Sequence, residues 1–392
     1  MNYILSDGNN REALFPFTFT RPVADMRQGI LTLREKWEWH LGTTTSTLTV
    51  PYLQEKFPLI LGKENIVING SYPPTAALVK AILNLKLGEV LLKEDDVVAV
   101  ATSDPLAVFK RSDYEKIKFS EPCEPLVHPW EIFSKNHAAI TADFELLTKG
   151  KTSQPISGTN TVLGDKSKIF LAEGAKVECS ILNTTDGPIY IGESAEIMEG
   201  CSVRGPFALC HNAVLKMGAR IYTGCTFGPY CKVGGEVNNA VLFAYSNKGH
   251  DGFLGNSVIG EWCNLGADTN TSNLKNNYAD VKLWDYQKEG FKLTGLQFCG
   301  LMMGDHSKCG INTMFNTGTV VGVSANIFGS GFPRNFIPSF SWGGAAGLVT
   351  YQTRKALDAS KAMMERRGMA LDKKEQAILE YVFELTKKWR RE

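Results

Sequence analysis

Apolar residues recur at every sixth position through the middle of the chain. The series is Ile191, Ile197, Val203, Leu209, Leu215, Ile221, Phe227 and Val233. Small residues stand two positions before most of them, at Ala195, Cys201, Ala213, Ala219, Cys225 and Cys231, with Phe207 as the exception. Residues i and i−2 share one face of a strand, whereas six helical steps of about 100° advance roughly 240° and would scatter the apolar positions. The period therefore predicts short strands joined by tight turns.

The same rhythm resumes twice further along the chain. It returns at Phe253, Ile259 and Leu265, with Ser257 and Cys263 as small residues, and again at Met303, Cys309, Phe315, Val321 and Ile327, with Ser307, Thr313, Thr319 and Ala325. Segments 238–252 and 284–300 interrupt it, and we expect them to be loops expelled from the repeat. An expelled loop can carry a site without disturbing a repetitive core.

This spacing resembles the hexapeptide repeat of left-handed parallel β-helices, in which three hexapeptides complete one triangular coil. The resemblance implies a left-handed β-helix domain over residues 160–345. It also implies a homotrimer, because hexapeptide acyltransferases commonly place their acyl-CoA cleft between neighbouring coils.

The flanking regions have different patterns. Residues 1–150 alternate strand and helix signals, with strands at "MNYILS", "NIVING" and "DDVVAVA" and a helix at "TAALVKAILNLK", and this alternation predicts an α/β domain. Residues 148–160 are polar and rich in turn formers, which is typical of a linker. Residues 350–392 predict two helices, about 350–367 and 372–391, with Gly368 and Asp372 as caps. We expect them to cover the open end of the β-helix.

Composition narrows the class of protein. The 392 residues carry a net charge of +1 and are 43% hydrophobic, which predicts a globular chain with no footprint for nucleic acid. The sequence shows neither a signal peptide nor a membrane-spanning apolar stretch, so we expect a cytoplasmic protein that does not bind membranes. None of the nine cysteines forms a CxxC pair, so most are interpreted as small core residues and no metal site is predicted.

The N-terminal segment "ILSDGNNREALFPFTFTRPVADMRQG" resembles the opening signature of sugar-phosphate nucleotidyltransferases. In that family a strand ends in a glycine-bearing loop that holds a nucleoside triphosphate, since backbone N–H groups and cations must approach the phosphates closely. By this resemblance Gly8, Arg11, Arg21 and Arg27 are the nucleotide-binding candidates. Ordinary surface or ion-pair roles are the alternative for each arginine.

The same segment departs from the family pattern at two positions. Val23 stands where the family has a lysine, and Ser71 stands where it has an aspartate that helps to hold Mg²⁺ on the triphosphate. Asp7 and Asp104 could supply a carboxylate, although neither lies in the expected frame. The domain is also short, so it is interpreted as a trimmed or divergent relative for which Mg²⁺ remains a possible cofactor.

A motif in the repeat, "GHDGFLGNSVIGEWCNLGADTNTSN", resembles the acetyltransferase half of the bifunctional enzymes that make UDP-N-acetylglucosamine. By that resemblance His250 is the catalytic base, Asn264 a neighbour of the substrate amine and Asn273 an active-site asparagine. Acetyl transfer to an amine needs a base near neutral pKa, which suits histidine. A solvated loop histidine is the alternative interpretation, and His211 and His306 are interpreted as turn residues.

Cations near the motif are candidates for the phosphate groups of the substrates. Lys248 and Lys282 are expected to bind the phosphate of an amino-sugar phosphate, and Arg334 a phosphate of coenzyme A. The predicted substrates are therefore a sugar phosphate, a nucleoside triphosphate and acetyl-CoA.

These resemblances lead to three hypotheses. The first is an enzyme of nucleotide-sugar synthesis that transfers acetyl from acetyl-CoA to glucosamine-1-phosphate, uridylyl from UTP to N-acetylglucosamine-1-phosphate, or both. The second is a nucleotidyltransferase for another sugar-1-phosphate, with the β-helix used only for oligomerisation. The third is a catalytically silent assembly subunit, which Val23 and Ser71 make credible for the N-terminal half.

Overall fold

In the computed structural model, which describes residues 1–108 and 113–390, the chain divides into two compact units. The first unit comprises Met1–Leu14, Thr20–Met26 and Leu31–His128, and the second comprises Phe15–Phe19, Arg27–Ile30 and Pro129–Glu392. The border between the two units therefore lies after His128. The reason is that helix α5 (Asn136–Thr148) packs on strands of the second unit.

The first unit is an α/β fold built on one mixed sheet. Its strands have the order β2-β1-β3-β5-β4-β6 and comprise β1 (Asn2–Ser6), β2 (Ser46–Leu48), β3 (Asn65–Asn69), β4 (Glu89–Lys93), β5 (Asp96–Thr102) and β6 (Glu115–Lys118). Strand β1 runs parallel to both of its neighbours. The helices are α1 (Leu33–Leu41), α2 (Pro51–Gln54) and α3 (Ala76–Leu83). The strands and the helix expected from the sequence are confirmed in this region.

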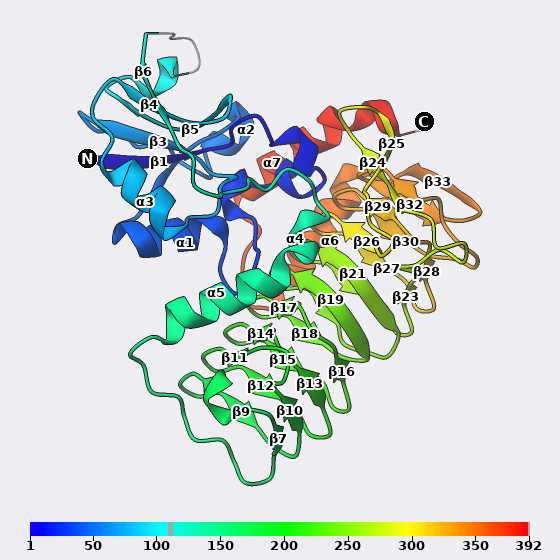
Figure 1. Cartoon of the computed structure of the whole chain (residues 1–392). Coiled ribbons are helices and arrows are strands. Elements are labelled where there is room, and N and C mark those ends of the chain that lie inside the picture. Colours follow the sequence, from blue (N-terminus) through cyan, green and yellow to red (C-terminus); the bar gives the residue numbers. More distant parts are fainter. Residues whose placement is uncertain (109–112, 391–392) are drawn as a thin grey trace. The chain divides into compact units, whose positions relative to one another are not determined.

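The second unit is a left-handed parallel β-helix, as the six-residue period predicts (Figure 1). Its first face consists of β7 (Thr161–Leu163), β10 (Ile181–Asn183), β13 (Ser202–Arg204), β16 (Arg220–Ile221), the first halves of β19 (Glu236–Leu242) and β21 (Phe253–Ile259), β23 (Asn270–Thr271) and β28 (Met314–Phe315). Its second face consists of β8 (Ile169–Leu171), β11 (Ile189–Ile191), β14 (Phe207–Leu209), β17 (Cys225–Phe227), the second halves of β19 and β21, β26 (Leu301–Met303), β29 (Thr319–Val321) and β31 (Phe336–Ile337).

The third face is one continuous parallel ladder. It consists of β9 (Lys176–Val177), β12 (Glu196–Ile197), β15 (Val214–Leu215), β18 (Lys232–Val233), β20 (Asn247–Lys248), β22 (Asn264–Leu265), β27 (Lys308–Cys309), β30 (Asn326–Ile327) and β32 (Ser341–Gly344). Strand β33 (Gly347–Thr350) pairs antiparallel with β32 at the end of the ladder.

The residues of the six-residue series point into the coils. Every member from Ile191 to Val233 is at most 3% exposed, and the small residues beside them are equally buried. The nine cysteines are all free, and eight of them are buried, the exception being Cys179. Burial raises the pKa of both Cys225 and Cys231 to about 12, so these thiols stay protonated and serve as core residues.

The expectation of an expelled loop at 238–252 is wrong. Strands β19 and β20 keep this segment within the coils. The six-residue series of apolar residues does not reveal these strands, because Lys248 occupies an inward position, level with Val233 on the neighbouring strand. The register also shifts locally, so that Leu254 is fully buried at the position expected for Phe253, which is only partly buried.

The second expected loop does leave the coil. Between β23 and β26 the chain forms an antiparallel hairpin of β24 (Lys282–Asp285) and β25 (Gly290–Leu293). This hairpin, residues 282–293, overlaps the segment 284–300 that the sequence predicts to be a loop.

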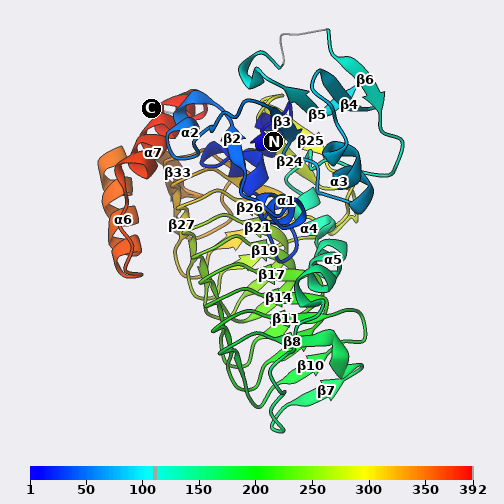
Figure 2. The same cartoon turned by 90° about the vertical axis from the view of Figure 1, so that its left-hand side faces the viewer.

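Two C-terminal helices run along one corner of the β-helix, beside its third face (Figure 2). They are α6 (Thr353–Glu365) and α7 (Lys373–Leu385), and Asp372 caps α7 as expected, accepting a hydrogen bond from the Glu375 N–H. Arg367 donates to Asn247 Oδ1 at 2.9 Å, and Phe383 packs edge-on against Phe340. The helices therefore cover a side of the coil, while β33 pairs with its terminal strand.

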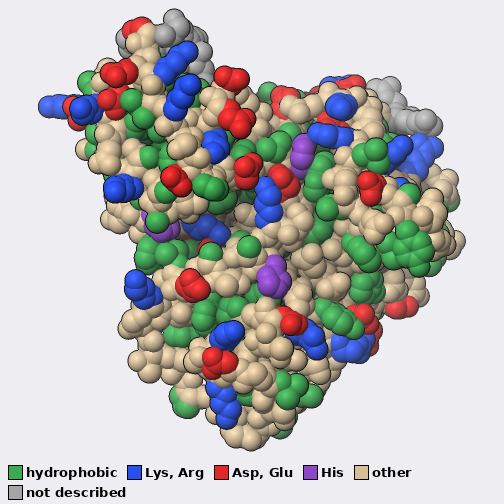
Figure 3. Space-filling view, viewed as in Figure 1, with side chains coloured by type: hydrophobic (Ala, Val, Ile, Leu, Met, Phe, Trp, Pro, Cys, Tyr) green, Lys and Arg blue, Asp and Glu red, His purple; other side chains and the backbone are tan. Residues whose placement is uncertain are grey.

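The surface of the protein carries mixed charge. Figure 3 shows charged side chains of both signs interspersed over the visible face. Over residues 1–108 and 113–390, no helix combines the length and the apolar character needed to cross a bilayer.

Candidate functional site

His250 lies at the corner that joins the third face to the first, between β20 and β21, and its side chain is exposed. Gly235, on the preceding coil, packs against the backbone of His250. A Cβ at Gly235 would lie only 2.8 Å from the His250 carbonyl oxygen. The next residue, Asp251, lies 3.6 Å from Arg220, whose guanidinium is also 3.8 Å from Glu236. The imidazole therefore projects from a closely packed corner beside a small group of charged side chains.

Lys248 lies two residues before His250 and points the opposite way, into the coil. It is 1% exposed, and its Nζ donates to the carbonyl oxygens of His250 at 2.7 Å and Gly234 at 3.1 Å. Burial lowers the pKa of Lys248 to about 8, although Asp251 partly opposes the shift. The Lys248 ammonium thus holds the backbone of the corner from inside the coil. A phosphate at the surface would not reach it.

Asn264 stands on the coil that follows His250, at the start of β22. It pairs with Asn247, so it lies three residues short of the level of His250, roughly 10 Å along the strand direction. Asn273 lies at the corner between the first and second faces and donates to Asn256 Oδ1 at 2.8 Å. A single chain therefore does not bring these three predicted residues into contact.

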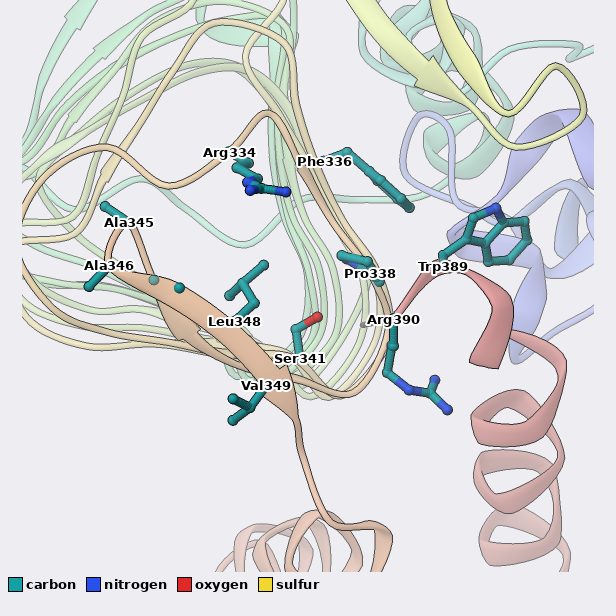
Figure 4. A pocket seen from close by; sticks show the side chains of 12 residues that line it. Arg334, Phe336, Pro338, Ser341, Ala345, Ala346, Leu348, Val349, Trp389 and Arg390 are labelled. Carbon is teal, nitrogen blue, oxygen red and sulfur yellow. The ribbon is translucent and has the colours of Figure 1, made fainter. Parts of the chain in front are cut away.

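Lys282 and Arg334 occupy two further places in the second unit. Lys282 is exposed on hairpin strand β24, and Arg334 is exposed just before β31. Arg334 lines a cavity of about 300 Å³, together with Phe336, Leu348 and the β32–β33 turn (Figure 4). Arg390 lines the same cavity, but its guanidinium points toward α7 and donates to the Phe383 carbonyl at 2.7 Å.

In the first unit, Gly8 follows the end of β1 and meets the end of β3. The two strands pair in parallel with Ser6 opposite Asn69, and Gly8 has a φ of +54°. A Cβ at Gly8 would lie 2.6 Å from Asn69 Oδ1, so glycine permits this close approach. Ligands of open α/β sheets bind at this carboxyl edge.

Three polar side chains at this edge, those of Asn10, Asn69 and Ser71, are uncharged and hydrogen-bonded to one another. Ser71, at the position of the family aspartate, is fully buried and donates to Asn69 Oδ1 at 2.8 Å. Asn10 Nδ2 donates in turn to the Ser71 hydroxyl at 3.1 Å. Sequence reasoning identified Ser71 as a departure but did not predict the two asparagines that accompany it.

The predicted arginines are divided between the two units. Arg11 is buried, donates to the Tyr52 hydroxyl at 2.6 Å and pairs with Asp7 at 3.3 Å. Arg21 is buried in the same unit, whereas Arg27 belongs to the second unit, where it donates to the Ile30 carbonyl. The structure therefore gives Arg11 and Arg27 partners within the protein.

The donor set of the first unit does not suit Mg²⁺. Asp7 accepts from the Val23 N–H at 2.8 Å and from the Thr49 hydroxyl, and burial raises its pKa. Asp104 is exposed, and the described residues contain no group of three or more His, Cys, Asp or Glu that could hold a metal ion. Mg²⁺ prefers oxygen ligands that include carboxylates, and the Asp7 carboxylate beside Gly8 is already bonded.

The chain thus consists of an α/β unit and a left-handed parallel β-helix unit. Residues 3–152 match the family described as sugar nucleotidyl transferase. Parts of the chain are also similar to bifunctional GlmU proteins.

The similarity to these relatives is modest and partial. Bifunctional protein GlmU of Cupriavidus pinatubonensis is 26% identical over 168 residues, which is 37% of each chain, and GlmU of Methanocaldococcus jannaschii is 33% identical over 87 residues, or 22% of this chain and 21% of that one. The putative uncharacterized acetyltransferase YaiX of Escherichia coli is 27% identical over 143 residues, or 36% of this chain and 61% of YaiX. The matches therefore span less than two thirds of these relatives.

Solved structures also show similarity at low identity. The UDP-N-acetylglucosamine acyltransferase of Francisella novicida is 14% identical, with a TM-score of 0.31 over 60% of this chain and 78% of that one. The polySia-specific acetyltransferase NeuO is 13% identical, with a TM-score of 0.25 over 50% of this chain and 87% of that one.

Proposed function

We propose that the chain transfers an acetyl group from acetyl-CoA to the amine of glucosamine-1-phosphate, with His250 as the general base. The observation that carries this proposal is the exposed imidazole on a rigid corner of the β-helix, whose backbone Lys248 holds from inside. A base on a regular element is positioned more accurately than one on a free loop. The similarity to GlmU and YaiX supports the same class of reaction.

The chemistry follows from the roles of these groups. The amine nitrogen attacks the thioester carbonyl carbon, so a C–N bond forms and the C–S bond breaks. His250 accepts the proton that the amine loses and passes it to the leaving thiolate. Arg334 supports the donor, because its exposed guanidinium beside a 300 Å³ cavity suits a phosphate of coenzyme A.

The separation of the residues favours a homotrimer as the active form. Strands β20, β22, β27 and β30 are successive neighbours, so roughly 14 Å along the coil axis separates the His250 level from the strand that precedes Arg334. Asn273 lies at another corner of the same coil region. In the proposed assembly, the corner of one chain faces a side of the next, and residues from two chains complete each site.

The second candidate function is uridylyl transfer from UTP to N-acetylglucosamine-1-phosphate. The family match over residues 3–152 favours it, and Gly8 at the carboxyl edge of β1 is a suitable place for phosphate approach. The bonded Asp7 and the uncharged Ser71 and Asn69 weigh against it. We therefore place acetyl transfer first.

Two assays on the full chain test these functions. One supplies acetyl-CoA and glucosamine-1-phosphate, and the other supplies UTP, Mg²⁺ and N-acetylglucosamine-1-phosphate. We expect acetylation without uridylylation, and a loss of at least about 100-fold in kcat/KM for His250→Ala. His211→Ala is the control, because His211 is an exposed turn histidine at another corner. Absence of acetylation in the unmodified chain overturns the proposal, and an unaffected His250→Ala variant overturns the assignment of the base.

A further inference from the structure

A cavity of about 280 Å³ lies in the second unit where β19 and β21 turn from the first face to the second. Helices α4 (Glu131–Ser134) and α5 pack beside these two strands (Figure 1). The proposed acetyl-transfer site makes no use of this cavity, and His250 does not line it.

The cavity arises where the six-residue period is shortened. The inward residues Val237 and Leu242 are five positions apart, as are Leu254 and Ile259, and all four are fully buried. Each short step requires a tight corner, which Asn239 and Asn256 make with φ of +46° and +47°. Asparagine tolerates this left-handed conformation better than other residues with a side chain.

Amide groups from these corners face the cavity. Asn238, Asn239 and Asn256 line it, and Gly224 on the coil below leaves room for the Asn239 amide, which a Cβ would approach to 2.8 Å. Asn256 is 8% exposed, and its Oδ1 accepts from Asn273. The amide nitrogens of all three have no hydrogen-bond partner among residues 1–108 and 113–390, so they are available to a ligand.

The remaining wall combines hydroxyl groups, an imidazole and one aromatic ring. Ser134, His137 and Thr223 contribute polar groups, and Phe298 is 46% exposed at the rim. Asp, Glu, Lys and Arg are absent from the described lining. A charged ligand would lose hydration here without gaining an opposite charge, so the cavity favours a neutral one.

We propose that this cavity binds a neutral pyranose, either a hexose or an N-acetylhexosamine. Several amides and hydroxyls converge on a small volume, and they match the alternating donors and acceptors of sugar hydroxyl groups. The Phe298 ring offers an apolar surface for the C–H face of the sugar. The volume lies at the lower end of ligand pockets, which fits one sugar ring and leaves no room for a nucleotide.

Saturation-transfer NMR on the full chain tests the proposal, with glucose, galactose, N-acetylglucosamine and N-acetylgalactosamine as probes and the free base adenine as a neutral non-sugar. We expect saturable binding of at least one pyranose, and at least about tenfold weaker binding by Phe298→Ala and by Asn238→Leu. Phe291→Ala is the matched control, because Phe291 is 50% exposed on the hairpin but does not line the cavity.

Three results would overturn the proposal. They are no saturable binding of any pyranose, equal binding by the Phe298→Ala and Phe291→Ala variants, or competition between adenine and the sugar. Circular dichroism of each variant separates loss of binding from loss of fold. Acetylation measured on the same proteins keeps this result distinct from the proposed function, which does not depend on Phe298.

Discussion

The Lys248 ammonium lies inside the β-helix and donates to the His250 carbonyl at 2.7 Å, while the His250 imidazole projects outward from the same corner. Lys248 occupies a position that aliphatic residues fill in neighbouring coils, between Val233 and the level of Leu265. A buried ammonium is costly unless it is hydrogen-bonded, and here two backbone carbonyls satisfy it. The stability of this corner therefore changes with the protonation state of Lys248.

Replacing Lys248 by Met should change how stability varies with pH. Burial lowers the pKa of Lys248 from 10.5 to about 8. Between these two values the unfolded chain binds a proton that the folded chain has released, so this group raises the free energy of unfolding as pH rises from 8 to 10.5. Lys248→Met should remove that increase, which amounts to roughly 1–3 kcal/mol. Urea unfolding at several pH values across this window measures it.

The comparison must be made between the two proteins at each pH. Burial lowers the pKa of Lys308 to about 8 as well, and the raised pKa of Cys225 acts in the opposite direction above pH 9. These contributions are common to both chains and cancel in the difference. Parallel pH profiles for the two proteins would contradict the interior placement of Lys248.

A second prediction concerns the packing of successive coils at Gly228. A Cβ at this position would lie 1.5 Å from the Phe243 carbonyl oxygen, which belongs to the backbone of the next coil and cannot move aside as a side chain can. Gly228→Ala should therefore cost at least roughly 3 kcal/mol of unfolding free energy. Gly249→Ala is the matched control, because a Cβ there meets nothing within 4 Å. Similar denaturation midpoints for the two variants would be inconsistent with this coil spacing.

The repeating part of the fold could be predicted because its signal is physical and periodic. Inward residues such as Ile197 and Leu215 must be apolar at every coil, so spacing alone reveals which side chains share the core. The same criterion fails where a coil uses a polar inward residue or a five-residue step. Segment 238–252 contains both exceptions, the inward Lys248 and the corner at Asn239. The apolar pattern is therefore lost there, and the sequence predicts an expelled loop.

The candidate site could be predicted only as a set of residue types. A motif identifies His250 and Asn264, but it does not say that the second lies three residues away from the level of the first. Likewise Arg11 and Arg27 are close in sequence, yet they belong to different compact units. Closeness in sequence also does not tell which arginine will form a buried ion pair, as Arg11 does with Asp7.

The last prediction tests Arg334 as the contact for a phosphate of coenzyme A. Its guanidinium is exposed beside the cavity and has no hydrogen bond or ion pair with the described residues, so removing it should leave the fold intact. Arg334→Ala should raise KM for acetyl-CoA about tenfold or more, with little change in kcat, because a remote phosphate contact contributes equally to substrate and transition-state binding. Arg354→Ala, at an exposed position on α6, is the control. An unchanged KM, or a fall in kcat alone, would show that Arg334 does not bind the donor.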